Sequence, residues 1–120
     1  MFRGDRGAAS LAFAKDTTKT RARRFVGSVR GEGGTDHVSA LKLALSLGPD
    51  VVFLLTDAEG GFTTADLIAI SGWNKSGAVI NAIEFGLGAQ RGNTDNSLRA
   101  VARESRGQYI YKDLRSFRDR

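Results

Sequence analysis

Apolar and polar positions follow one another along the chain in two kinds of block. One kind is a short apolar run, as in VVFLL at residues 51–55 and AVINAIEF at residues 78–85. The other kind repeats its apolar residues every three or four positions, as in residues 36–47 and 93–105. Runs of the first kind are typical of buried parallel strands, and the second spacing is typical of amphipathic helices. The pattern therefore predicts strands that alternate with helices.

The predicted series starts and ends with a strand. It comprises a strand at 8–14, helices at 17–30 and 36–47, a strand at 51–55, a helix at 63–73, a strand at 78–85, a helix at 93–105 and a strand at 108–111. This alternation specifies an α/β fold, a Rossmann-like and mostly parallel sheet with flanking helices and right-handed crossovers. Because VVFLL is apolar at successive positions, we expect helices to cover it on both faces.

Composition places the chain among globular proteins. With 120 residues it has the length of one domain, and 41% of its residues are hydrophobic and 26% charged. The absence of cysteine excludes disulfides and thiolate metal sites. No apolar run approaches the roughly 18 residues of a membrane span, and the start of the chain lacks the apolar core of a signal peptide. We therefore expect a soluble chain, and no compartment is indicated.

The net charge of +5 is concentrated at the start of the chain. Residues 1–30 hold eight basic and two acidic side chains, a net charge of +6, whereas residues 31–120 hold ten basic and eleven acidic ones. Two interpretations fit this segment. The favoured one is the solvated face of a helix, and the alternative is nucleic-acid or anionic-surface binding through Arg21, Arg23 and Arg24 of helix 17–30.

Three loops follow or precede the predicted elements at one edge of the sheet. Thr35 stands before the helix at 36–47, Asp57 follows the strand at 51–55, and the loop 86–92 follows the next strand. Ligands of α/β sheets bind at the carboxyl ends of the strands, so these positions are candidates for one crevice. The alternative for Thr35 or Asp36 is a helix N-cap, with Asp57 bonded to its own loop.

Four segments together resemble a known family. They are GGTD at 33–36, LGPDVVFLLTD at 47–57, INAIEFG at 80–86 and LRAVARESRGQYIY at 98–111. In this order they resemble the C-terminal part of a von Willebrand factor A domain, most closely its bacterial branch, over about residues 15–113. The resemblance implies a protein–protein interaction module with a metal-ion-dependent adhesion site.

In that family a Mg²⁺ ion binds an Asp-x-Ser-x-Ser loop, a threonine and an aspartate, and a carboxylate of the partner protein completes its shell. By position, Thr35 matches the threonine and Asp57 the aspartate. The chain has no Asp-x-Ser-x-Ser segment. We therefore expect a single partial domain, a fragment that lacks the first central strand. It would bind Mg²⁺ only once the missing ligands are supplied.

Loss of that central strand would leave VVFLL with an open edge, which recruits a partner strand or leads to self-association.

We expect that the chain is not an enzyme. His37 is the only histidine, and the chain has neither a G-x-S-x-G elbow nor a P-loop.

Overall fold

The computed structural model describes residues 11–31, 33–57, 61–90 and 96–117. The chain divides into two compact units, Met1–Gly34 and Thr35–Arg120. The first unit contains the helix α1 (Asp16–Ser28), which buries none of its residues. The second unit contains the sheet, the other α-helices and a 3₁₀ turn, η1 (Leu114–Phe117).

The strand expected at 8–14 is wrong where it can be compared. Residues 8–10 lie outside the described residues, and residues 11–14 form no strand. Leu11 and Phe13 are exposed, and the Phe13 carbonyl accepts hydrogen bonds from the Lys15 N–H and the Thr18 hydroxyl. These bonds turn the chain into α1. The alanine-rich segment is a weak strand former, which explains why the turn is preferred.

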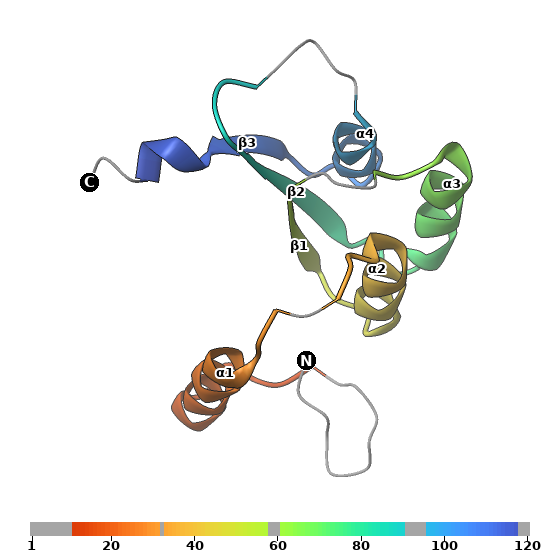
Figure 1. The fold of residues 1–120 in the computed structure, drawn as a ribbon. Helices are drawn as coiled ribbons and strands as arrows, with labels where there is room; N and C mark the ends of the chain where they lie inside the picture. Colours follow the sequence, from red (N-terminus) through yellow and green to blue (C-terminus); the bar gives the residue numbers. More distant parts are fainter. Residues whose placement is uncertain (1–10, 32, 58–60, 91–95, 118–120) are drawn as a thin grey trace. The chain divides into compact units, whose positions relative to one another are not determined.

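Three parallel strands confirm the α/β prediction. The strands β1 (Val51–Thr56), β2 (Val79–Gly86) and β3 (Tyr109–Asp113) form an open sheet in the order β1-β2-β3. All pairs are parallel, and Val51 lies opposite Val79. The fold is therefore an incomplete, Rossmann-like sheet with helices, as expected (Figure 1).

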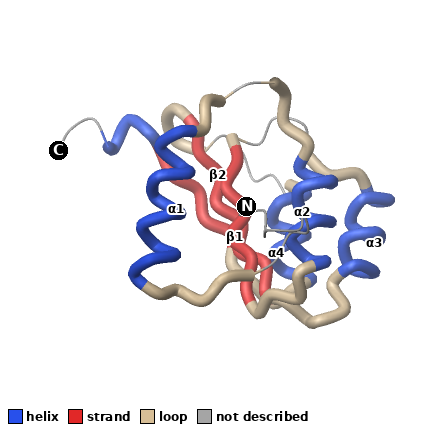
Figure 2. The backbone as a smooth tube through the Cα atoms, turned by 90° about the horizontal axis from the view of Figure 1, so that it is seen from below, coloured by secondary structure: helices blue, strands red, loops and turns tan. Residues whose placement is uncertain are grey.

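The three helices α2 (His37–Ser46), α3 (Thr64–Trp73) and α4 (Ser97–Glu104) lie together on one side of the strands (Figure 2). The core lies between these helices and the strands. It is made of Leu41, Leu45, Leu54, Phe62, Ile70, Ala78, Ile80, Ala82, Leu98, Val101 and Ala102. Both β-α-β connections place their helix on the same face because such crossovers share one hand.

The expectation that helices cover VVFLL on both faces is therefore wrong. Leu54 is buried against the helices, whereas its neighbours Phe53 and Leu55 are exposed, as is Val51. Successive side chains of a strand point to opposite faces, so helices on one side cover only every second residue.

The helix ends follow the capping chemistry of their residues. Asp36 caps α2 by accepting a hydrogen bond of 3.0 Å from the Ser39 N–H, as one of the sequence alternatives predicts. Thr63 and Asp66 form a capping box at the start of α3. Each cap satisfies backbone N–H groups that have no partner within the helix.

The end of α4 is a Schellman motif with an unusual residue. The N–H of Arg106 donates to Arg103 and the N–H of Gly107 donates to Ala102, at 3.1 and 2.7 Å. Arg106 has a left-handed φ of 63° at the position where glycine is normally found. Gly107 cannot be replaced easily, since a Cβ there would lie 1.9 Å from the carbonyl oxygen of Ile80.

No helix among the described residues is long and apolar enough to cross a membrane.

Candidate functional site

One face of the sheet is free of α2, α3 and α4. The register places the side chains of Val51, Phe53, Leu55, Ile83, Phe85 and Ile110 on this face, which we call the open face. Phe53 is the most exposed residue of the open face, with 66% of its surface accessible. Large contiguous apolar patches are rare on monomers and mark interaction sites.

The outer edge of β1 is open as well. In the described part of the chain β1 pairs with β2 on one side only, so the N–H and C=O groups of its other side have no strand partner. The strand VVFLLT carries no charge and no proline. Exposed edges usually carry lysine, proline or a bulge as protection against strand addition. The open edge of β1, expected from the sequence, is thus present among the described residues.

The loops before α2 and after β1 lie next to each other at the carboxyl edge of the sheet. His37, the first residue of α2, and Thr56, the last of β1, are buried, and Nε2 of His37 lies 2.9 Å from the Thr56 hydroxyl. The His37 ring also packs near Phe62, with centroids 5.9 Å apart. The sequence indicated no task for His37, and the structure gives it a place in the core.

Thr35 and Asp57, the two residues matched to the adhesion site, flank this buried pair in sequence. Both are exposed. Hydrogen bonds from the Ser39 hydroxyl and N–H lower the pKa of their neighbour Asp36 below its ordinary value, so Asp36 is held as a charged helix cap.

The residues present do not by themselves fit a Mg²⁺ site. Mg²⁺ requires near-octahedral oxygen coordination, and Thr35 and Asp57 supply two side chains. Among the described residues no group of three or more His, Asp or Glu is placed to hold a metal ion. Thr35 and Asp57 thus need further ligands from elsewhere.

A polar cluster lies beside the end of β2, next to the Thr56 position. Glu84, the register partner of Thr56, accepts hydrogen bonds from the Tyr109 hydroxyl and from the Asn96 amide, the latter at 2.9 Å. The Gln90 amide donates to the Tyr109 hydroxyl at 2.8 Å. Burial, followed by the hydrogen bond to Glu84, raises the pKa of Tyr109, so its phenol remains neutral. The cluster joins β2, the start of α4 and β3.

The described part of the loop 86–92, residues 86–90, is fixed to the end of β3. The Tyr111 hydroxyl donates to the Gly88 carbonyl, and the Gly88 N–H donates to the Asp113 carboxylate, both at 2.8 Å. A Cβ at Gly86 would lie 2.2 Å from the Tyr111 hydroxyl. Residues 91 and 92 lie outside the described residues.

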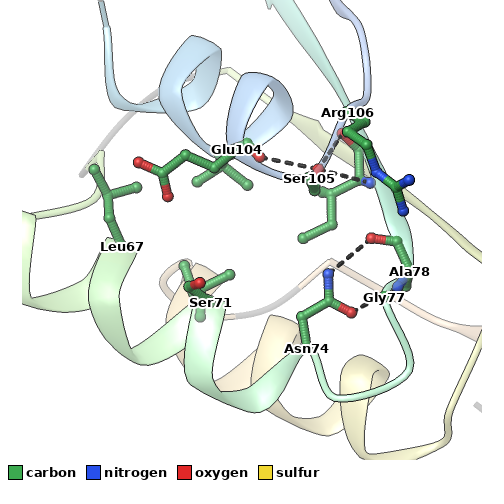
Figure 3. Close-up of a pocket in the computed structure, with 11 residues that line it drawn as sticks. Leu67, Ser71, Asn74, Gly77, Ala78, Glu104, Ser105 and Arg106 are labelled. Carbon is green, nitrogen blue, oxygen red and sulfur yellow. Dashed lines mark hydrogen bonds between the residues drawn. The ribbon is translucent and has the colours of Figure 1, made fainter.

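A small pocket of about 200 Å³ opens between α3 and α4 (Figure 3). Leu67 and Ser71 line it from α3, and Glu104 and Arg106 line it from the end of α4. Asn74 closes the end near β2 by exchanging two hydrogen bonds with the backbone of Ala78, at 2.7 and 2.8 Å. The side-chain amide of Asn74 thus joins the end of α3 to the start of β2.

Asn81 and Glu84 are polar residues within the strand predicted at 78–85, and the sequence alone assigned neither of them a role. Asn81 accepts a hydrogen bond of 2.9 Å from the Gln108 N–H, and Glu84 belongs to the cluster described above. A polar residue in an otherwise apolar strand was the available signal for both. Tyr109 and Arg99 gave no such signal, since each also fits an ordinary strand or helix surface.

No protein-family model matches the chain, and no curated protein matches its sequence. The resemblance to the von Willebrand factor A family rests on the motifs of the sequence.

Proposed function

We propose that this chain is a protein–protein interaction module in which the partner adds a strand to the outer edge of β1. The observation that carries the proposal is the edge itself: among the described residues VVFLLT has a strand partner on one side only, carries no charge or proline, and is continuous with the open face. Backbone hydrogen bonds along such an edge give affinity, and the alternate side chains of the added strand give specificity.

The chemistry of the partner follows from the surface that receives it. An added strand places every second side chain beside Val51, Phe53 and Leu55. These side chains are apolar and exposed, so the partner segment is extended and apolar at alternate positions. The resemblance to the von Willebrand factor A family supports the same class of function, since that family binds proteins.

The Mg²⁺ contact implied by the resemblance is not needed for this mode of binding. Thr35 and Asp57 would take part only with ligands supplied by another segment or chain. The proposed contact is consequently insensitive to chelators and depends weakly on salt, because it is built from backbone hydrogen bonds and apolar contacts.

The test uses the full chain and peptides selected from a random library for binding to it. We expect selected peptides to alternate apolar residues, to slow hydrogen exchange of the β1 amides and to lose affinity for the variant Phe53→Thr. Peptides that bind this variant equally well and leave β1 exchange unchanged would contradict the proposal. Sedimentation of the chain alone tests whether a second copy of the chain donates the strand. A dimer that Phe53→Thr dissociates would identify a second copy as the strand donor.

The alternative function is nucleic-acid or anionic-surface binding through α1. It is favoured by one observation, the exposure of Arg21, Arg23 and Arg24 on a helix that buries no residue. Binding of this kind weakens steeply with salt and is unaffected by Phe53→Thr. A salt titration with a single-stranded oligonucleotide therefore distinguishes the two functions.

A further inference from the structure

A second surface, separate from β1, gathers positive charge. Along one side of α4 and the following turn, Arg99, Arg103 and Arg106 line a groove of about 440 Å³. Tyr109 and Gly107 form its wall on the side of β3. Arg99 and Arg103 are four residues apart and so lie one turn apart on the same side of α4, and Arg106 lies in the turn after the helix.

The guanidinium group of Arg99 is held in place before any ligand arrives. It lies over the Tyr109 ring, 4.6 Å from its centroid, and its Nη2 donates to the Gln90 amide at 3.3 Å. Tyr109 is held in turn by Glu84, to which its hydroxyl donates. A tyrosine phenol is neutral at neutral pH, so Tyr109 adds no charge that cancels that of the arginines. The Nε of Arg99 is buried and has no hydrogen-bond partner among the described residues.

Arg106 adopts an energetically unfavourable backbone conformation in the turn after α4. Its left-handed φ of 63° occupies the glycine position of a Schellman motif, where a side chain adds strain and nothing to the cap. Figure 3 shows the side chain extending beside Gly77 and Ala78.

We propose that this groove binds a small organic phosphate that carries two or more negative charges, with Arg99, Arg103 and Arg106 as its ligands. Three guanidinium groups match a phosphate or diphosphate better than a single carboxylate, because each offers paired N–H donors to adjacent oxygens. The volume is within the range of small-molecule sites. Within the described residues no carboxylate forms an ion pair with Arg99 or Arg106. Tyr109 and Gln90 are positioning residues that hold Arg99.

The test is a calorimetric and NMR titration of the full chain with inorganic pyrophosphate at physiological salt. We expect saturable binding that shifts the signals of residues 99–109, and an affinity about tenfold lower in Arg103→Gln. Arg106→Gly is the decisive variant, because it relieves the strain. We expect it to unfold at a higher urea concentration and to bind pyrophosphate about tenfold more weakly. The matched control Arg23→Gln removes the same charge from α1 and leaves the affinity unchanged.

Three outcomes would overturn the proposal: no saturable binding of pyrophosphate to the parent chain, unchanged affinity in Arg106→Gly, or an equal loss in Arg23→Gln. ADP as a second probe separates the sources of the phosphate. Equal affinity for ADP and pyrophosphate supports recognition of phosphate alone, and tighter binding of ADP supports a nucleotide. Binding of single-stranded RNA that Arg103→Gln abolishes, without binding of pyrophosphate, would replace the small ligand by nucleic acid.

Discussion

The imidazole of His37 and the hydroxyl of Thr56 meet in the buried part of the protein, 2.9 Å apart. The contact joins the first residue of α2 to the last residue of β1. His37 is two residues after Thr35, and Thr56 directly precedes Asp57. The contact thereby fixes the relative placement of the two loops that hold Thr35 and Asp57.

Replacement of Thr56 by valine tests this contact. The side chains have similar shape, but valine leaves the buried Nε2 of His37 without this partner. We expect the free energy of unfolding to fall by about 1–3 kcal/mol. The control Thr56→Ser keeps the hydroxyl and should recover much of the loss. Urea denaturation measures both, and equal losses in the two variants would show that packing of the methyl group matters more than the hydrogen bond.

Two glycine-to-alanine changes should have opposite signs. At Gly107 a Cβ would meet the backbone carbonyl of Ile80 at 1.9 Å, so the chain must move and we expect a loss of about 1–3 kcal/mol. At Gly72, inside α3, a Cβ meets no atom within 4 Å. There alanine should raise the free energy of unfolding by up to about 1 kcal/mol through its helix propensity. Thermal melts of the two variants provide the comparison, and a destabilised Gly72→Ala would contradict it.

The open face should bind apolar dyes. The double variant Phe53→Thr with Leu55→Thr removes its most exposed side chains and keeps strand propensity, so ANS fluorescence should fall while stability changes by less than about 1 kcal/mol. Ile68→Thr is the control, since Ile68 is 70% exposed on α3, outside the open face. An equal fall of fluorescence in the control would show that the dye reports general exposure.

Acid should destabilise the protein through three helix and loop carboxylates. Hydrogen bonds lower the pKa values of Asp36, Asp66 and Asp113 below 3.8, with the Ser39 and Thr63 side chains and the Gly88 N–H as the respective main donors. Because the folded pKa values are depressed, their stabilisation is present above pH 3.8 and is lost as the pH falls through the lower folded values. Urea midpoints measured from neutral to acid pH should show this loss. The urea midpoint should fall less steeply with decreasing pH in Asp66→Asn than in the parent chain. An equally steep fall would exclude a contribution from the cap of α3.

Magnesium should have little effect on the chain alone. Two oxygen ligands hold the ion weakly, and a ligand stabilises a fold only when its concentration exceeds its dissociation constant. We therefore expect millimolar MgCl₂ or EDTA to leave the melting temperature unchanged. If MgCl₂ raised the melting temperature and Asp57→Ala removed this rise, the chain would complete a Mg²⁺ site around Asp57.

Much of the fold could be predicted because its signals are local. Asp36 and Gly48 mark the ends of α2, and Gly48 has the positive φ that glycine commonly adopts just after a helix. Leu98, Val101 and Ala102 are buried as the helical spacing indicates. Ile68 is apolar and lies in the predicted helix 63–73, yet it is exposed, because a short helix on one side of a three-stranded sheet buries only a narrow stripe of its residues.

The sequence by itself determined the α-helices and strands of the second unit and their parallel arrangement, since periodicity and capping chemistry act over a few residues. Only the tertiary structure decided that all three helices of the second unit cover the same face, which leaves Phe53 and Leu55 exposed. It also decided that Glu84 meets Tyr109 and Asn96, and that three arginines share one groove. Contacts of this kind join residues far apart in the chain, and local pattern has no information on which distant side chains meet.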